Sequence, residues 1–309
     1  MKLIKGTEYA KVIKEEVAEA TKLIKELKGD TVSLVIIQVG NNPASDTYVK
    51  NKIKACTDMG IEATLSKFPE DIKESVLLME IEKLNSNPNV HGIIVQLPLP
   101  KHINEMNVAC HIDFRKDIDG LNPANIGFLD TGMLSLVPCT AIGIVETLAK
   151  IYAERNDSIE GKHCVVVGRS NIVGKPVAKL MLMENATVTI CHSKTKHLED
   201  ITRTADILIV AVGIPNFIQR KHVRNGVVII DVGINKDENG KLCGDVDFNN
   251  VKDKAWMITP VPGGVGPLTT AMVGKNTVRA YNLQNPDDEE IKPEISIRVN
   301  KPEENKEEE

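Results

Sequence analysis

Tyr48 and Lys52 are the first side chains along the chain whose types and spacing could serve chemistry. They follow a turn-forming run, GNNPA at 40–44, in a predicted helix where residues four apart share one face. An amine on that face, at the carboxyl end of a parallel strand, could project into the crevice where open α/β sheets bind ligands. The alternative is a solvated surface, because Lys50, Lys52 and Lys54 alternate as the lysines of exposed helices commonly do.

Polar side chains near the ends of later segments of the chain could face the same crevice. Gln96 lies near the end of the apolar run 90–97, where an amide needs either a partner, as in a capped strand end, or a site to face. Asp117 and Asp119 stand in a glycine turn, where acids more often bond the local backbone than a ligand. No third carboxylate or histidine lies at a suitable offset, so the pattern predicts no metal site.

A glycine-bounded turn follows the β-branched run 164–167. Gly168 and Gly174 bracket it, and a helix-like segment comes next. This is the layout of a dinucleotide-binding β-turn-α unit, in which backbone N–H groups at a helix start hold a pyrophosphate. The spacing departs from G-x-G-x-x-G, because Arg169 and Ser170 stand where the second glycine is expected. The turn alone is a weak signal.

The end of the next strand favours one nucleotide over another. This strand, 186–191, is followed by His192, Ser193 and Lys194 rather than by an acid. An acid there would bond the ribose 2′-hydroxyl of NAD, whereas a basic and hydroxylated end, with Arg169 nearby, suits the extra phosphate of NADP. The predicted cofactor is therefore NADP.

The densest Pro/Gly loop of the chain covers 260–267. Gly263, Gly264 and Gly266 stand between prolines and give a fixed surface with few side chains, which lets a flat ligand approach the backbone. A plain connecting loop rarely needs that combination.

The elements that must position these groups alternate between helix and strand. Ser45 is a plausible N-cap for a helix that runs to about Met59. Apolar periodicity predicts further helices over 7–27, 75–85, 140–152, 176–184 and 269–282. Strands are predicted over 32–39, 62–68, 90–97, 164–167, 187–191, 207–212 and 227–232, and loops over most of 98–139. This alternation predicts an α/β protein with two domains, each a mainly parallel, doubly wound sheet.

Length and composition fit that architecture. The 309 residues are enough for two domains, and 42% hydrophobic with 3% aromatic residues predicts cores of Val, Ile, Leu and Ala. No apolar run reaches the roughly 20 residues of a membrane span, and the N-terminus has no signal or transit pattern. Six scattered cysteines without a C-x-x-C pair are expected to be reduced thiols, so a cytoplasmic protein is predicted.

The net charge of −5 is unevenly distributed. Ten acidic and four basic residues give the stretch 285–309 a net charge of −6, so the rest of the chain carries about +1. The stretch is expected to be a weakly ordered, solubilising tail, with a partner-binding tail as the alternative. The body has no basic stripe of the kind that nucleic acid would need, so no nucleic-acid partner is expected.

Seven of these motifs, in order, resemble the bifunctional methylenetetrahydrofolate dehydrogenase/methenyltetrahydrofolate cyclohydrolase family. The resemblance covers roughly residues 3–283 and rests on 40–56, 96–100, 116–121, 138–140, 168–174, 191–195 and 262–267. Two positions depart from the family pattern, Ala141 in place of a usual Pro and Leu268 in place of a usual Met. Both changes are apolar and lie away from the proposed chemistry.

The resemblance implies a role for each candidate residue. Lys52 would be the catalytic lysine and Gln96 its orienting partner, Tyr48 would pack on the aromatic part of folate, and Asp119 would bond the pterin edge. The remaining folate contacts would be Val95, Leu97, Pro262, Gly263, Gly264, Val265 and Gly266. NADP contacts would be Gly168, Arg169, Ser170, Ser193 and Ile234, to which the glycines of the turn and of a strand end add Gly174 and Gly213.

The implied activity has two steps. Methylenetetrahydrofolate is oxidised with NADP to the methenyl compound, which is then hydrolysed to 10-formyltetrahydrofolate. The domains would be a folate-binding catalytic domain over 1–139, with a C-terminal helix, 269–283, packed back on it, a Rossmann-type NADP-binding domain over 140–268, and the acidic tail over 284–309. Family members are typically homodimers paired through the nucleotide domain, so a homodimer is expected.

Three rival functions explain fewer of the motifs. A dehydrogenase without the hydrolase step would not need Lys52 and Gln96, and both are present. An NADP-linked reductase of the shikimate dehydrogenase type would not need the 262–267 loop or the pair of Tyr48 and Lys52. A non-catalytic nucleotide-sensing module would tolerate the loss of Lys52.

Overall fold

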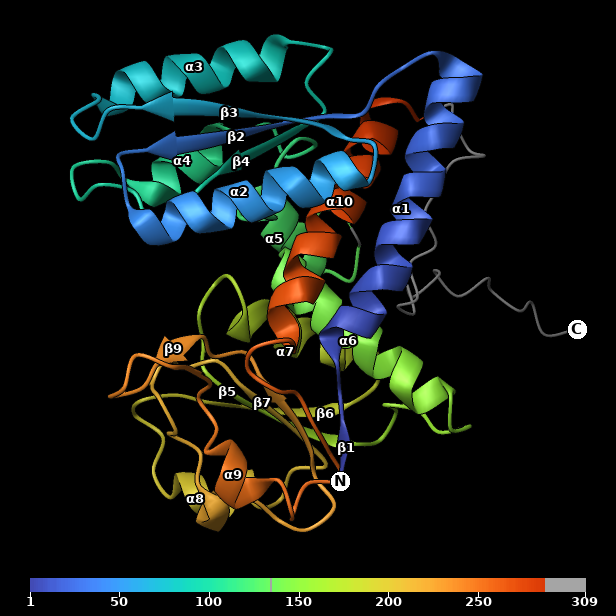
Figure 1. The fold of residues 1–309 in the computed structure, drawn as a ribbon, viewed down its shortest axis with the longest axis vertical. Helices are drawn as coiled ribbons and strands as arrows, with labels where there is room; N and C mark the ends of the chain where they lie inside the picture. The colour runs from blue at the N-terminus through green and yellow to red at the C-terminus, as the bar shows by residue number, and fades with distance from the viewer. Residues whose placement is uncertain (134, 287–309) are drawn as a thin grey trace, which may run out of the picture.

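The computed structural model describes residues 1–133 and 135–286 (Figure 1). The helices are α1 (Gly6–Lys28), α2 (Pro43–Asp58), α3 (Glu74–Ser86), α4 (Glu105–His111), α5 (Pro123–Asp130), α6 (Cys139–Ala153), α7 (Gly174–Met183), α8 (Leu198–Thr202), α9 (Phe248–Val251) and α10 (Val265–Gln284). The strands are β1 (Lys2–Leu3), β2 (Ser33–Val39), β3 (Glu62–Phe68), β4 (Gly92–Val95), β5 (His163–Val167), β6 (Thr187–Cys191), β7 (Ile207–Val210), β8 (Val228–Asp231), β9 (Asn235–Lys236), β10 (Leu242–Cys243) and β11 (Met257–Ile258).

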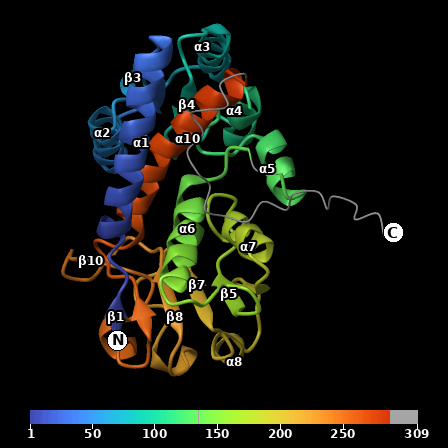
Figure 2. The same ribbon diagram turned by 90° about the vertical axis from the view of Figure 1, so that its right-hand side faces the viewer.

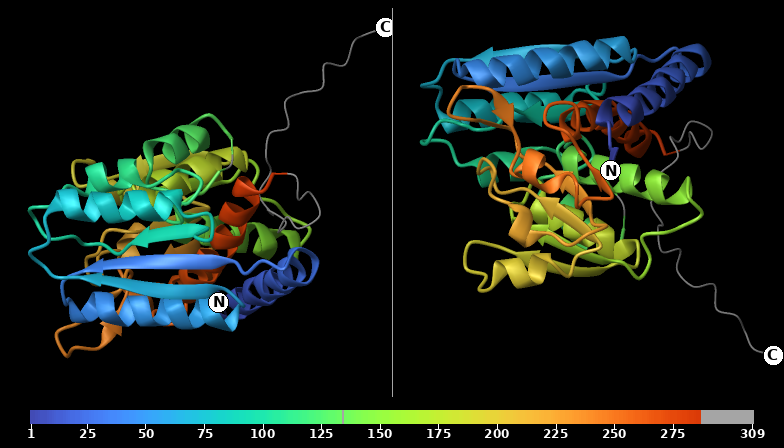
Figure 3. Two further views of the ribbon diagram at one scale, coloured as in Figure 1. Left: turned by 90° about the horizontal axis from the view of Figure 1, so that it is seen from above. Right: turned by 60° about the horizontal axis from the view of Figure 1, so that its bottom comes forward.

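The first sheet has three parallel strands in the order β3-β2-β4. Helices lie on both sides of it (Figure 3), so alternate residues of β2 enter different cores. Leu34 and Ile36 face the side of α1 and α10, whereas Ile37 and Val39 face the side of α3 and α4. The chain leaves β2 toward β3 and returns to the opposite side at β4. The carboxyl ends of β2 and β4 therefore form a topological switch point, where such sheets bind ligands.

The second sheet has six strands in the order β1-β11-β8-β7-β5-β6, all parallel. Its switch point lies between β5 and β7. The first strand, β1, pairs with β11 through Lys2 opposite Met257. The predicted division into domains placed these N-terminal residues with the first sheet instead. A two-residue strand has no periodicity that sequence analysis could detect.

Three long helices connect the sheets. Figure 2 shows α1, α6 and α10 side by side, and α10 packs against α1, α6 and α2. One apolar core runs from the first sheet through these helices to the inner face of the second sheet, and each sheet has a further core on its outer face. The carboxylate of Glu146 on α6 lies in this interface and accepts a bond of 2.8 Å from Nζ of Lys275 on α10.

Several predicted boundaries are wrong. Helix α2 begins at Pro43, so Ser45 lies inside it, and the side-chain oxygen of Asn42 accepts the Ser45 N–H at 3.3 Å. Helix α10 begins at Val265, inside the Pro/Gly loop, rather than at residue 269. Helices α4 and α5 stand in the segment predicted to be loops.

The predicted tail is mostly outside the described residues. Its first residue, Gln284, is the last residue of α10, and 287–309 are not described. Among the described residues, no helix is long and apolar enough to cross a membrane.

Candidate active site

A hydrogen bond joins the two switch-point strands at their carboxyl ends. Lys52, on the helix after β2, donates from Nζ to Oε1 of Gln96, which follows β4, at 3.2 Å. The amide of Gln96 is held in turn, because its Nε2 donates to the carbonyl of Leu97 at 2.7 Å. The amide oxygen therefore points at the amine. Lys52 is half-buried, whereas Lys50 and Lys54 are exposed, so the solvated-surface interpretation applies to those two lysines but not to Lys52.

One turn before Lys52, the side chain of Tyr48 is 46% exposed. It lies on the same face of α2, as the four-residue spacing predicts. An aromatic ring exposed beside the lysine is available to pack on a planar ligand.

Asp119 and Lys52 act on one buried thiol, that of Cys139 at the start of α6. Burial raises the pKa of Cys139 well above its usual range, the charge of Asp119 raises that pKa further, and the charge of Lys52 opposes both. The thiol donates to the carbonyl of Ile118 at 3.5 Å. The carboxylate and the amine, from two elements that are far apart in sequence, therefore both influence the pKa of this thiol.

Asp117 and Asp119 have different environments. The carboxylate of Asp117 is buried and accepts the backbone N–H of Asn122 at 2.7 Å and Nδ2 of Asn125 at 3.0 Å. Burial raises the pKa of Asp117 to about 6, against the opposing effect of these bonds. Asp117 thus bonds the local backbone, as turn acids usually do, and holds the turn that presents Asp119.

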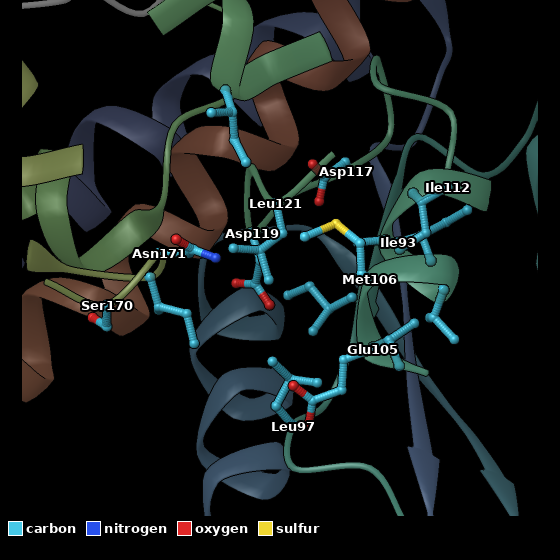
Figure 4. Close-up of a pocket in the computed structure, with 16 residues that line it drawn as sticks. Ile93, Leu97, Glu105, Met106, Ile112, Asp117, Asp119, Leu121, Ser170 and Asn171 are labelled. Carbon is cyan, nitrogen blue, oxygen red and sulfur yellow. The ribbon is translucent and has the colours of Figure 1, made fainter. Parts of the chain in front are cut away.

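A cavity of about 320 Å³ separates the first sheet from the glycine turn of the second (Figure 4). Ser170 and Asn171 of the glycine turn lie on one side of it, Ile93, Met106 and Ile112 on the other, and Asp119 between them. Val95 and Leu97 also line it, and most of its lining side chains are apolar. The wall does not include Tyr48, Lys52, Gln96 or the 262–266 loop, so the cavity is only part of the predicted site.

The glycine turn brings backbone against backbone. Gly168 has φ +130°, and a Cβ there would lie 2.2 Å from the carbonyl oxygen of Ala211 after β7. A Cβ on Gly174 would lie 2.3 Å from the carbonyl oxygen of Gly168. The hydroxyl of Ser170 accepts the N–H groups of Val173 and Gly174 at 3.1 and 3.4 Å. Ser170, in place of the second glycine, therefore stabilises the turn that leads into α7.

The other predicted cofactor contacts lie on exposed segments. The side chains of Arg169 and Ser193 are exposed, and Ser193 is in a tight turn in which the His192 N–H donates to the Thr195 hydroxyl at 2.8 Å. Gly213, with φ +68°, has open space around it. All of these residues follow carboxyl ends of strands in the second sheet, on the side of the glycine turn.

The Pro/Gly loop meets both halves of the molecule. A Cβ on Gly266 would lie 3.9 Å from Cδ1 of Ile234, so a predicted cofactor contact is next to a predicted substrate contact. A Cβ on Gly6 of α1 would lie 1.7 Å from the carbonyl oxygen of Gly264, so no side chain fits there. Pro262 is exposed, whereas Val265 is buried in the first turn of α10 and faces the core.

Sequence reasoning missed a contact between the amino-terminal parts of α6 and α10. The hydroxyls of Thr140 and Thr269 are 3.0 Å apart. Thr140 follows Cys139, whose pKa is influenced by the charges of Lys52 and Asp119, and Thr269 follows the Pro/Gly loop, so this pair joins the segment of Cys139 to that loop. Sequence analysis noted both threonines only as parts of motifs, and their separation of 129 positions gave no signal.

The described residues contain no group of three or more His, Cys, Asp or Glu side chains that could hold a metal ion. A nucleotide, by contrast, fits the second sheet. The close packing of Gly168 and Gly174 leaves a surface without side chains at the amino end of α7, which is what a pyrophosphate requires.

Two family models match the chain and divide it between them. Residues 4–119 match the catalytic domain of tetrahydrofolate dehydrogenase/cyclohydrolase, and residues 138–285 match its NAD(P)-binding domain. A bifunctional protein FolD from Listeria innocua is 50% identical over 279 residues, which are 90% of this chain and 96% of the relative.

Solved structures give the same result. The bifunctional FolD enzyme of Campylobacter jejuni has a TM-score of 0.88 at 45% identity, covering 92% of this chain and 99% of that one. A Trypanosoma brucei dehydrogenase-cyclohydrolase, solved with NADP cofactor and an inhibitor, has a TM-score of 0.84 at 37% identity, covering 91% and 97%. The chain belongs to the tetrahydrofolate dehydrogenase/cyclohydrolase family.

Proposed function

We propose that this protein oxidises methylenetetrahydrofolate to methenyltetrahydrofolate with NADP and then hydrolyses the product to 10-formyltetrahydrofolate. The family membership supports both steps. The observation that carries the hydrolase step is the 3.2 Å bond between Nζ of Lys52 and Oε1 of Gln96. Neither a shikimate-type reductase nor a nucleotide sensor would use this pair.

In the oxidation, the main task of the protein is to position folate and NADP relative to each other. Hydride leaves the carbon that bridges two folate nitrogens as an iminium develops, so geometry matters more than a base. NADP supplies the hydride acceptor when bound. Gly168, Gly174 and the amino end of α7 would hold its pyrophosphate, and Arg169 and Ser193 its 2′-phosphate.

For the hydrolysis, Lys52 would move protons. Water adds to the bridging carbon, and one ring nitrogen must then be protonated before its bond to carbon breaks. An amine can accept the proton of the water and deliver it to that nitrogen. Gln96 cannot titrate, but its amide oxygen fixes the amine at one point. Asp119, which lines the cavity, would bond the pterin edge, and the exposed Tyr48 would pack on the aromatic part of folate.

The wider assignments extend this proposal. The folate domain would comprise residues 1–139 with the helix 269–283 packed back on it, and the NADP domain residues 140–268. The two family matches, to 4–119 and 138–285, support a break near residue 139. We infer a cytoplasmic enzyme from the six free cysteines, and a homodimer without nucleic-acid partners from the family and the near-neutral body. Sedimentation of the purified protein tests the dimer.

A paired assay tests the function. Oxidation of methylenetetrahydrofolate is followed with NADP and with NAD, and water addition to the methenyl compound is measured separately without nucleotide. We expect both activities, with NADP preferred. If neither nucleotide is reduced, the proposed function is wrong. A preference for NAD would contradict only the assignment of Arg169 and Ser193.

A further inference from the structure

Two buried carboxylates lie behind the exposed cofactor segments of the second sheet, and the mechanism above does not use them. Asp231 is the last residue of β8 and is 3% exposed, and Asp245, two residues after β10, is 0% exposed. A carboxylate buried in this way is costly unless hydrogen bonds satisfy it. The groups that donate hydrogen bonds to these two carboxylates show which segments of the chain the carboxylates hold in place.

Asp245 holds the segment after β7. Its Oδ2 accepts the backbone N–H groups of Val212 and Gly213 at 2.7 and 3.0 Å. Its Oδ1 accepts the N–H of Ile214 at 2.9 Å and Nδ2 of Asn235 at 2.8 Å. One side chain therefore ties the loop that carries Gly213 to the segment that carries Ile234.

Asp231 continues the same network. Its Oδ1 accepts the backbone N–H groups of Gly233 and Asp245 at 3.0 and 2.9 Å, and its Oδ2 accepts that of Val246 at 3.0 Å. Its own N–H donates to the hydroxyl of Thr259 at 2.7 Å. Thr259 immediately precedes the Pro/Gly loop. The network therefore reaches from the two cofactor loops, which carry Gly213 and Ile234, to the Pro/Gly loop, which carries the predicted folate contacts.

The backbone packs closely against both carboxylates, so that no side chain fits at Gly233 or Gly244. A Cβ on Gly233 would lie 2.3 Å from Oδ1 of Asp245, and a Cβ on Gly244 would lie 1.8 Å from Oδ2 of Asp231. Seven N–H donors, six of them backbone, bond the two carboxylates, so that each of the four oxygens accepts at least one. No group of three or more possible metal ligands occurs among the described residues, so the pair is not interpreted as a metal site.

The hydrogen bonds of Asp231 and Asp245 help to fix the distance between bound NADP and bound folate. Ile234 follows Gly233, and its exposed side chain lies close to Gly266 of the substrate loop. Hydride transfer depends steeply on the approach of donor and acceptor carbons. Hydrolysis at Lys52, on the opposite half of the molecule, requires no nucleotide.

We propose that Asp245 and Asp231 are positioning residues for the oxidation, which set the two cofactor loops against the Pro/Gly loop without touching either ligand. The inference rests on the proposed function. It predicts that damage to the pair separates the two activities, whereas a purely structural role would lower both together.

Asp245→Asn tests this. Each oxygen of Asp245 accepts two N–H groups, so the NH₂ of an asparagine opposes two donors whichever way the amide turns. We expect kcat/KM for NADP in the oxidation to fall by about tenfold or more. Water addition to the methenyl compound, measured without nucleotide, should stay within about twofold of wild type, because that step gains nothing from the cofactor loops.

Asp206→Asn is the matched control. Its carboxylate also accepts a backbone N–H, that of His163 at 2.7 Å, but at the amino ends of β5 and β7, away from the cofactor edge. This variant should keep the wild-type ratio of the two activities. If Asp245→Asn also keeps that ratio, whether both activities are intact or both are reduced, the pair is only structural and the inference is wrong.

A milder variant covers the case in which Asp245→Asn does not fold. Asn235→Ala removes one of the four bonds to Asp245 and leaves the carboxylate satisfied by backbone. It should shift the ratio in the same direction by a smaller factor, and an unchanged ratio would overturn the proposal. Wild-type protein that lacks the oxidation altogether would instead contradict the proposed function itself.

Discussion

The amine of Lys52 and the amide oxygen of Gln96 meet at 3.2 Å across 44 positions of sequence. The contact exists because β2 and β4 are neighbours in the first sheet, so that the helix after one strand faces the residue after the other. Neither residue identifies a site alone. Together they place a half-buried amine in a defined direction at a switch point.

Replacing Lys52 should separate the two steps. Lys52→Ala is expected to lower hydrolysis of the methenyl compound by about 10²–10⁴-fold, the range for loss of a general acid–base group, while NADP binding stays intact. Lys50→Ala, an exposed lysine on the same helix, is the control and should retain both activities. Initial rates of hydrolysis and calorimetric titration with NADP measure the two effects. Full hydrolase activity in Lys52→Ala would remove this residue from its role.

Gly168 should not tolerate a side chain. In Gly168→Ala the new Cβ would overlap the carbonyl oxygen of Ala211 at a strained φ of +130°, so we expect a loss of about 3 kcal/mol or more in unfolding free energy, with weakened NADP binding. Gly226 also has a positive φ, +81°, but open space around it, so Gly226→Ala should cost only about 1–2 kcal/mol. Urea denaturation compares them, and equal losses would argue against the close packing at Gly168.

Asp117 should make stability depend on pH. Its folded pKa of about 6 exceeds the usual 3.8, so its stabilising contribution is present below about pH 4 and lost as the pH rises through 6. The loss corresponds to about 3 kcal/mol. In Asp117→Asn an oxygen can still accept the bonds from Asn122 and Asn125, which share one carboxylate atom. Between pH 4 and 7, wild-type unfolding free energy should therefore fall relative to the variant. A constant difference would contradict the raised pKa.

Glu146 should be the critical member of the buried ion cluster between α6 and α10. It accepts bonds from Lys275 at 2.8 Å and Arg279 at 3.4 Å, and Glu146→Gln leaves both cations without a buried counter-charge. We expect a loss of about 3–5 kcal/mol in unfolding free energy. Lys275→Met should cost less, because Arg279 still pairs with the carboxylate. Chemical denaturation measures the loss of unfolding free energy in both variants. A larger loss in Lys275→Met than in Glu146→Gln would contradict this account.

Much of the fold follows from periodicity, because long elements repeat their apolar pattern. The strand predicted over 62–68 matches β3, and the helix predicted over 7–27 differs from α1 by one residue at each end. Short elements carry too few residues to show a period, which is why α4 and the two-residue β1 were missed. Ser45 was mistaken for a cap because Pro43, which begins α2, and Asn42, whose side chain accepts the Ser45 N–H, were assigned to the preceding turn.

The candidate site was harder to predict, since its contacts depend on strand order. Local spacing could place Tyr48 and Lys52 on one face, but not bring Lys52 to Gln96. It could mark the glycine turn, but not show that the Ser170 hydroxyl bonds the backbone of Val173 and Gly174 within it. The Thr140–Thr269 contact and the Asp231–Asp245 network join segments that only the folded chain brings together.

The pairing of Lys2 with Met257 also affects how the molecule is assembled. On the ribosome, Lys2 and Leu3 emerge more than 250 residues before the strand that receives them, so the six-stranded sheet cannot be completed until β11 has been synthesised. The helix α1, which follows β1 directly, packs on α10, which is made later still. Neither half of the molecule is thus a contiguous piece of chain, and a fragment of residues 140–268 would lack its edge strand.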